Sequence, residues 1–393
     1  MNPFFKVLTF ILLCTACQNT VSKGQTIQHK ITPGAERIDI YGPMLHNSNI
    51  GLIVNQTSTV KSKHLVDELL SRDLNVIRIF SPEHGFRGQA DAGEQLSNEV
   101  DKVSGLPIVS LYGKHKKPRS EDLAGIDMLV FDIQDVGVRF YTYISTLHYV
   151  MEAAAEANIP LVLLDRPNPL ISYTDGPILE KEFKSFVGMH PVPVVYGMTI
   201  GEYGQMINGE KWLKDGMQCQ LEVIAIENFS RRAQYILPIK PSPNLPNNVA
   251  IGHYPSLCFF EGTTVSIGRG TPFPFQVIGH PNVDASSFEF TPQSGAGSKY
   301  PKHEGQLCKG ENLQQVKPKK NQLDLTFLQE YYKKLNGQNI AFFNDDNFFN
   351  LLAGTDQLKE DIIAHKSEDE IRASWQPGLI EFQMMREKYL IYK

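Results

Sequence analysis

The sequence lacks the patterns that mark most metal, nucleotide and nucleic-acid sites. Cysteines 219, 258 and 308 have no Cys-x-x-Cys neighbour, and no His-Glu-x-x-His pattern occurs, so we predict no metal site. Gly-x-Gly-x-x-Gly and the Walker A pattern are also missing, and we therefore expect no cofactor. The net charge of -5 and the absence of a basic, aromatic-rich stripe argue against nucleic acid as a partner.

No hydrophobic run is long enough to span a bilayer, but a short one stands near the start. Lys6 precedes the apolar residues 7–13, and Cys14-Thr-Ala-Cys17 follows, which is the layout of a bacterial lipoprotein signal. We predict a signal peptide over 1–17, lipidation of Cys17 and a polar tether over 18–30. Gln18 favours the outer membrane, facing the periplasm; the alternative is an ordinary secretory signal.

Five apolar runs predict a parallel sheet. They cover residues 50–55, 75–80, 107–112, 127–132 and 160–165, and each ends in polar residues. Helical spacing over 65–70 and 140–157 separates them. We therefore expect an α/β fold over 31–240, a Rossmann-like, doubly wound, mostly parallel sheet. Ligands bind at the carboxyl edge of such sheets, where the polar residues gather.

The rest of the chain, 241–393, is expected to form a smaller α+β domain that completes a cleft. Pro241-Ser-Pro-Asn-Leu-Pro246 suits a domain connection. Apolar spacing predicts a helix over 325–335 that Gly337 ends, and Ser367 with Glu370 predicts a capping box. Pro377-Gly378 is expected to interrupt the last helix.

One turn carries the densest chemistry. Ser81-Pro-Glu-His-Gly-Phe-Arg-Gly88 follows a predicted strand, so Glu83, His84 and Arg87 stand at the carboxyl edge of the sheet. The alternative is a salt-bridged structural turn.

Together, five motifs resemble the exo-β-N-acetylmuramidase family of glycoside hydrolases. They are residues 81–88, 131–137 with 139–143, 164–169, 241–244, and 261–263 with 268–271. The resemblance implies a Rossmann-like domain, a smaller second domain and an active site between them. It also implies release of N-acetylmuramic acid from the non-reducing ends of peptidoglycan fragments (MurNAc-GlcNAc). Peptidoglycan-derived muropeptides or disaccharides are thus the expected partners, with the membrane reached through the lipid anchor.

Glycoside hydrolysis requires an acid that protonates the leaving oxygen, and a group that meets the anomeric carbon from the other face. We assign the acid to Glu83, with His84 as an orienting or substrate-binding neighbour. The second role falls to Glu261, to Asp132 or to the 2-acetamido group of the sugar.

Muramic acid carries a lactyl carboxylate, which an arginine binds well through its bidentate fork. Four arginines inside the motifs are candidates: Arg87, Arg139, Arg166 and Arg269. The expected substrate-binding set also contains one tyrosine, suited to stack on a sugar, and four amides: Tyr141, Asn55, Gln134, Asn168 and Asn244.

Two other function classes stay open on the sequence. One is a non-catalytic envelope lipoprotein that binds muropeptides. The other is an NAD-dependent glycosidase or oxidoreductase on the same scaffold, against which the missing glycine fingerprint argues. The oligomeric state is not predicted.

Overall fold

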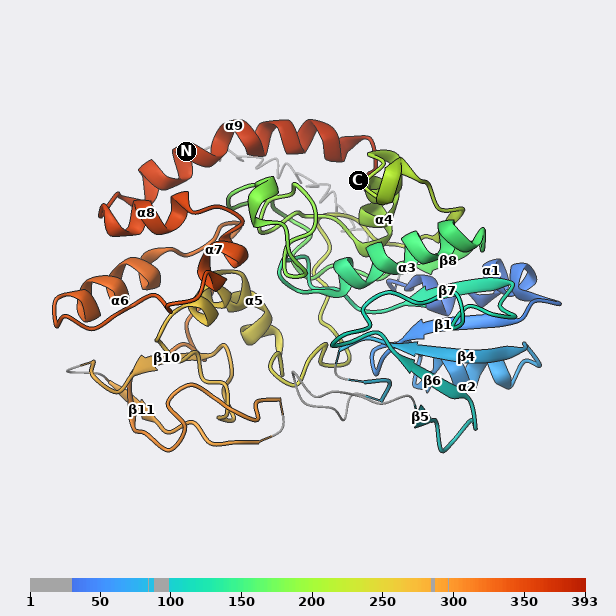
Figure 1. Ribbon diagram of the computed structural model, residues 1–393, viewed down its shortest axis with the longest axis horizontal. Coiled ribbons are helices and arrows are strands. Elements are labelled where there is room, and N and C mark those ends of the chain that lie inside the picture. Colours follow the sequence, from blue (N-terminus) through green and yellow to red (C-terminus); the bar gives the residue numbers. More distant parts are fainter. Residues whose placement is uncertain (1–29, 84, 88–98, 284–286, 296) are drawn as a thin grey trace, which may run out of the picture. The chain divides into compact units, whose positions relative to one another are not determined.

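The computed structural model (Figure 1) describes residues 30–83, 85–87, 99–283, 287–295 and 297–393. Residues 31–393 form one compact unit. The predicted signal peptide and its lipidated Cys17 lie outside the described residues, as does the predicted tether apart from Lys30. Within the described ranges, no helix has the length and apolar character needed to cross a membrane.

A central sheet of seven strands forms the first half of this unit, in the order β5-β6-β4-β1-β7-β8-β9. Six strands run parallel, and β5 pairs antiparallel with β6 at one edge. The bounds are β1 (Ile50–Val54), β4 (Val76–Ser81), β5 (Glu99–Val100), β6 (Pro107–Ser110), β7 (Met128–Asp132), β8 (Leu161–Leu164) and β9 (Leu221–Ile224). The predicted doubly wound, mostly parallel sheet is confirmed.

The strand order reverses between β1 and β7, because β4 and β6 extend the sheet to one side of β1 and β7, β8 and β9 to the other. Carboxyl ends of strands at such a reversal form the crevice in which doubly wound sheets bind ligands. The five predicted strands all occur. The sixth parallel strand, β9, was missed because the exposed Glu222 breaks a four-residue apolar run.

Helices cover both faces of the sheet, and strand residues alternate between the two cores. On one face, Ile53, Phe131 and Leu163 pack with α3 (Tyr143–Ala157) and α4 (Ile200–Gly209). On the other, Leu52 and Val130 pack with α1 (Ile38–Leu45) and α2 (Leu65–Leu70). This period of two is what β geometry dictates, and burial on both faces explains the nearly continuous apolar runs.

The second half is built around a smaller antiparallel sheet, β10-β12-β11. Its strands are β10 (Val277–His280), β11 (Phe288–Phe290) and β12 (Cys308–Asn312). The helices are α5 (Asn248–Leu257), η4 (Cys258–Gly262), α6 (Thr326–Asn336), α7 (Phe348–Ala353), α8 (Gln357–Ile363) and α9 (Glu368–Glu387). Short elements complete the described chain: η1 (Gly34–Glu36), β2 (Thr59–Val60), β3 (Lys63–His64), η2 (Lys181–Phe183) and η3 (Lys214–Gly216).

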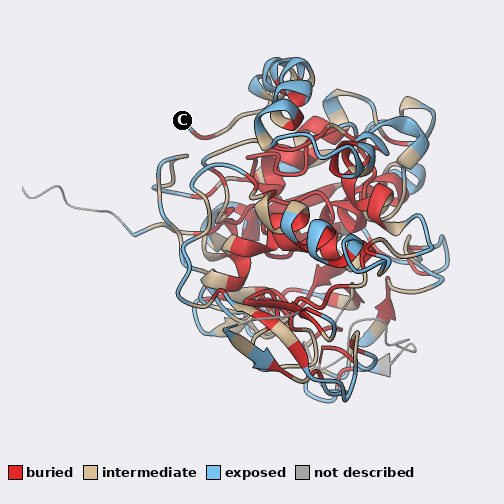
Figure 2. Cartoon of the chain, turned by 90° about the vertical axis from the view of Figure 1, so that its left-hand side faces the viewer, coloured by how far each residue is buried: buried red, intermediate tan, exposed pale blue. Residues whose placement is uncertain are grey.

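One apolar core joins the two halves. It continues from the sheet and α3 into α5, α6 and α9, through residues such as Leu147, Leu257, Leu328 and Trp375. Figure 2 shows these buried residues running through the middle of the chain, with exposed residues on its outer helices. The boundary at 240/241 stays a prediction.

The expected interruption of the last helix is wrong. Helix α9 begins at the predicted capping box, Ser367 with Glu370, and continues through Pro377 for 20 residues. Ile371, Trp375, Leu379 and Phe382 are buried along one face of it. Burial of these four side chains outweighs the hydrogen bond that proline removes, roughly 3 kcal/mol in an isolated helix.

Two buried histidines make the fold sensitive to acid. His148 Nδ1 lies 2.9 Å from His190 Nε2, and His190 Nδ1 lies 3.0 Å from the Tyr203 hydroxyl. Burial lowers the pKa of His148 to about 4 and moves the pKa of His190 in the same direction; Glu152, 3.6 Å from His148, opposes the shift and Lys184 adds to it.

On acidification, the histidines of the unfolded chain take up protons at a higher pH than the buried histidines of the folded chain. The free energy of unfolding that they contribute is therefore present above pH 6.5 and is lost as the pH falls toward 4. His148 alone contributes about 3 kcal/mol of this loss. We expect His148→Asn to flatten the dependence of the unfolding midpoint on pH between 6.5 and 4. The exposed His46→Gln variant should keep the wild-type slope; equal slopes in all three proteins would contradict the account.

Candidate active site

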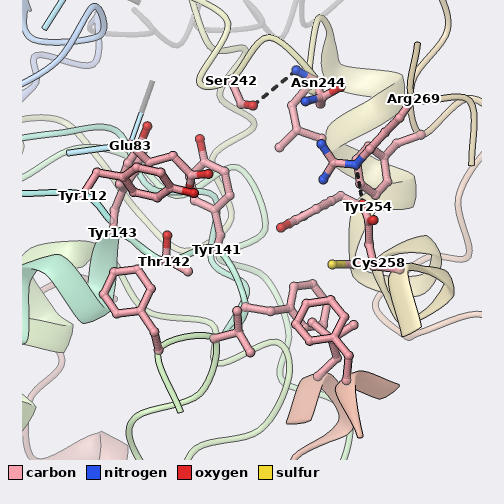
Figure 3. A pocket seen from close by; sticks show the side chains of 18 of the residues that line it. Glu83, Tyr112, Tyr141, Thr142, Tyr143, Ser242, Asn244, Tyr254, Cys258 and Arg269 are labelled. Atoms are coloured by element: carbon pink, nitrogen blue, oxygen red, sulfur yellow. Dashed lines mark hydrogen bonds and ion pairs between the residues drawn. The ribbon is translucent and has the colours of Figure 1, made fainter. Parts of the chain in front are cut away.

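A pocket of about 470 Å³ opens where the loops after the sheet strands face the second half of the chain. Its volume falls in the range of small-molecule sites, roughly 300–1,000 Å³. Four charged residues line it: Glu83, Lys116, Glu261 and Arg269. In Figure 3, Glu83 and Arg269 enter the pocket from opposite sides.

Glu83 stands on the turn after β4, as predicted. Pro82 ends the strand, and Gly85 has φ 75, a conformation that glycine adopts without strain. Glu83 is half-buried and lies near Tyr143, since its negative charge joins burial in raising the pKa of that hydroxyl. Tyr143 in turn accepts a hydrogen bond of 3.0 Å from Asn55 Nδ2. His84 lies outside the described residues.

The opposite wall comes from η4 and the glycine-rich segment after it. Arg269 Nε donates to Glu261 Oε1, and its guanidinium lies 5.2 Å from the centre of the Phe275 ring. The ammonium of the half-buried Lys302 donates to the carbonyls of Phe260 (2.6 Å), Glu261 (3.0 Å) and Thr263. Lys302 thus fixes the backbone that carries Glu261, although burial lowers its own pKa to about 8.

Two further predicted residues line the pocket. Tyr141 donates from its hydroxyl to the Pro241 carbonyl (2.8 Å), which ties the sheet side to the crossing segment. Asn244 donates from Nδ2 to the Gly297 carbonyl (2.7 Å). The pocket therefore brings together Glu83, Tyr141, Asn244, Glu261 and Arg269 from the expected set.

Asp132 and Arg166 lie beneath this pocket and not in its lining. Arg166 binds Asp132 with two hydrogen bonds, Nε to Oδ1 at 2.5 Å and Nη2 to Oδ2 at 2.8 Å. Asp132 has no exposed surface, and Arg166 is 4% exposed. The expectation that Asp132 or Arg166 contacts substrate is not supported, because the charged groups of the two side chains are buried and bound to each other.

The remaining predicted residues are also engaged elsewhere. Gln134 donates to the Asp135 and Pro167 carbonyls, and Asn168 donates to the Met198 carbonyl. Arg87 pairs with Asp101 through Nε at 3.0 Å and Nη2 at 2.9 Å. Together with Asn55, these side chains hold the loops that carry the pocket, and they are absent from its described lining.

Arg139 is enclosed completely. It is wholly buried, and it donates to the carbonyls of Pro177 (2.8 Å), Val192 (2.7 Å), Leu352 (3.0 Å) and Ala353 (2.5 Å). Burial lowers its pKa to about 9. Its guanidinium joins α7 to the segment between β8 and α4, so the structure gives it a supporting role.

Sequence reasoning missed several lining residues. Tyr143 falls within the predicted helical spacing over 140–157 and was not named as a site residue, yet its ring faces the pocket beside Tyr112 and Thr142 (Figure 3). Tyr254 and Cys258 come from α5 and η4, where only the adjacent Glu261 had drawn attention. Lys116 sits in a lysine-rich loop after β6 that carried no motif.

Replacing Arg139 tests whether this residue stabilises the fold or binds substrate. Arg139→Met leaves four buried carbonyls without donors, and we expect the free energy of unfolding to fall by about 3 kcal/mol or more. The KM of the protein that stays folded should be unchanged. Arg232→Met, at an exposed position, serves as the control with little effect on stability. A raised KM with unchanged stability would contradict this assignment.

Both halves of the chain match family models. Residues 50–249 match the N-terminal model of exo-beta-N-acetylmuramidase NamZ, and residues 253–392 match the C-terminal model. The peptidoglycan beta-N-acetylmuramidase NamZ of Bacillus subtilis (strain 168) is 38% identical over 408 residues, with 98% of this chain and 97% of that protein covered.

Two crystal structures of DUF1343 family proteins from Bacteroides fragilis NCTC 9343 have the same fold. One is 45% identical with a TM-score of 0.85, and it covers 93% of this chain and 99% of its own. The other is 29% identical with a TM-score of 0.81, covering 92% and 99%. The predicted resemblance is therefore confirmed, and this chain belongs to the exo-β-N-acetylmuramidase NamZ family.

Proposed function

We propose that this chain is an exo-acting glycosidase that releases N-acetylmuramic acid from the non-reducing ends of peptidoglycan fragments. The observation that carries the proposal is the pocket that Glu83, at the carboxyl edge of the sheet, lines together with Glu261, while Arg269, the ion-pair partner of Glu261, faces Glu83 from the opposite side (Figure 3). Membership of the NamZ family supplies the reaction class.

Glu83 is the general acid of this proposal. Its carboxyl group lines the pocket and stands among the rings of Tyr112, Tyr141 and Tyr143 (Figure 3), where it has access to a bound sugar. Asn55 donates to the Tyr143 hydroxyl and accepts from the Thr57 amide at 2.9 Å, which ties this wall to the loop after β1. Protonation of the leaving oxygen is the step that a glycosidase acid performs.

Of the two protein groups considered for the opposite face, Glu261 is better placed than Asp132. Glu261 lines the pocket and is held by Arg269, whereas Asp132 is enclosed with Arg166. We assign Glu261 to activate water or to orient the 2-acetamido group of the sugar. Aromatic rings, among them Phe140, Tyr141 and Tyr254, offer the apolar surface against which sugar rings pack.

Glu83→Gln tests the general-acid role of Glu83, because the loss of kcat should depend on how much the leaving group needs a proton. We expect kcat for MurNAc-GlcNAc to fall at least about 100-fold, since the amide cannot donate the proton. A nitrophenyl β-MurNAc glycoside, whose leaving group needs little protonation, should lose far less.

The exposed Glu121→Gln variant is the control for this pair of assays and should behave as wild type. Equal losses on the two substrates would remove Glu83 from the acid role. No sugar release by the wild-type protein would favour the non-catalytic, muropeptide-binding alternative.

We also propose that the protein is a lipoprotein of the cell envelope, anchored through Cys17 and facing the periplasm from the outer membrane. The supporting features are the apolar run after Lys6, the small residues before Cys17 and the polar stretch that follows. A lipid anchor would place the pocket where peptidoglycan fragments are produced.

Cys17→Ser tests the anchor. We expect the variant to leave the membrane fraction for the soluble fraction of the cell envelope, with the activity of the purified protein unchanged. Cys14→Ser is the matched control and should stay with the membrane. Membrane association of both variants would contradict lipidation at Cys17.

A further inference from the structure

Among the charged side chains that line the pocket, one cation has no acidic partner within the described residues. Among the described residues, two carboxylates, Glu83 and Glu261, face two cations, Lys116 and Arg269. Arg269 is bound to Glu261 through a direct ion pair. Lys116 has no carboxylate partner in the part of the chain that the structure describes. A carboxylate ligand in this pocket is repelled by Glu83 and Glu261, so it needs a cation that is not already paired with an acid.

Lys116 is held at the pocket by an aromatic ring and not by an acid. Its Nζ lies 4.2 Å from the centre of the Phe186 ring, which also lines the pocket. Phe186 stacks on Tyr149 of α3, with ring centres 6.2 Å apart and an angle of 13°. Ser145, also on α3, donates to the Phe186 carbonyl at 2.7 Å. The ammonium is therefore held in place against the pocket wall and is half-buried.

Lys116 also belongs to a second hollow that adjoins the first. A cavity of about 340 Å³ is lined by the run from Gly113 to Lys117 and by Tyr149, and it shares Gly113 and Lys116 with the pocket. Lys117 is occupied by Glu152 and Glu156, both at 2.7 Å, whereas Lys114 and His115 are exposed. The pocket thus continues into a basic rim.

We propose that Lys116 is the specificity residue that binds a carboxylate of the substrate. Two sources in the substrate class supply such a carboxylate. One is the lactyl group of muramic acid. The other is a peptide stem, which converts the lactyl carboxylate into an amide and carries carboxylates of its own. The inference rests on the proposed function for its ligand class.

The arginines expected to bind this carboxylate are already engaged. Arg87 pairs with Asp101, Arg166 with Asp132 and Arg269 with Glu261. Arg139 is enclosed by carbonyls. Freeing Arg87, Arg166 or Arg139 would leave a buried acid or several carbonyls without a partner, and freeing Arg269 would break its ion pair with Glu261, whereas Lys116 needs no rearrangement.

The test is calorimetric binding of three ligands, which does not depend on turnover. They are MurNAc, its neutral lactyl amide, and a muramyl dipeptide with carboxylates only on the stem. We expect Lys116→Met to weaken MurNAc at least tenfold and to leave the amide unchanged, while Lys116→Arg restores most of the affinity.

Lys359→Met is the matched control, because Lys359 also lies over a phenylalanine ring, 4.9 Å from the centre of Phe343, but away from the pocket. It should bind all three ligands as wild type does. A loss confined to MurNAc identifies the lactyl carboxylate, and a loss confined to the dipeptide identifies the stem.

Equal effects of Lys116→Met on MurNAc and on the amide, or no effect on any ligand, would overturn the inference. Absence of wild-type binding to all three would overturn it too. If the wild-type protein binds MurNAc in a Lys116-dependent way but releases no sugar from MurNAc-GlcNAc, the proposed function fails while the carboxylate site stands.

Discussion

A buried ion pair between Asp132 and Arg166 holds together the sheet edge on which the pocket stands. Asp132 ends β7, Arg166 follows β8, and Arg166 Nη2 also donates to the Thr59 carbonyl (3.0 Å) beyond β1. Removing one partner of such a pair leaves an uncompensated charge, at a typical cost of 3–5 kcal/mol. The pair thus links the carboxyl ends of β7 and β8 to the segment after β1, and the chain that leaves β7 carries Tyr141 and enters α3 at Tyr143.

The sheet could be predicted because its signal is local. Five apolar runs were long enough to stand out, and the capping box at Ser367 marks its helix start through a contact between neighbours in sequence. The missed strand β9 and the unbroken helix α9 depend on distant parts of the chain. β9 forms by pairing with β8, and Pro377 is tolerated because the tertiary core buries the helix on both sides of it.

The sequence analysis found charged residues of the kind that the pocket contains, but it did not separate those that line the pocket from those that support it. Glu83, Glu261 and Arg269 do line one pocket; Glu83 and Arg269 stand on turns, and Glu261 stands in the short helix η4. Asp132, Arg139 and Arg166 have equally reactive side chains in equally compact motifs, yet they are buried against partners far along the chain. No sequence pattern separates a charge that faces a ligand from one that binds carbonyls. Lys116 shows the converse, because its loop has no motif and only packing on Phe186 brings it to the pocket.

We therefore propose that the acids of this pocket act on a sugar, and that Lys116, which has no carboxylate partner among the described residues, selects a sugar with an anionic group. The measurement that tests this most directly compares release from a chromogenic β-MurNAc glycoside with release from the β-GlcNAc analogue, without added NAD or metal. The account predicts rapid release from the first and little from the second, since only MurNAc carries the lactyl carboxylate. Equal release from both, or release only when NAD is supplied, would contradict it.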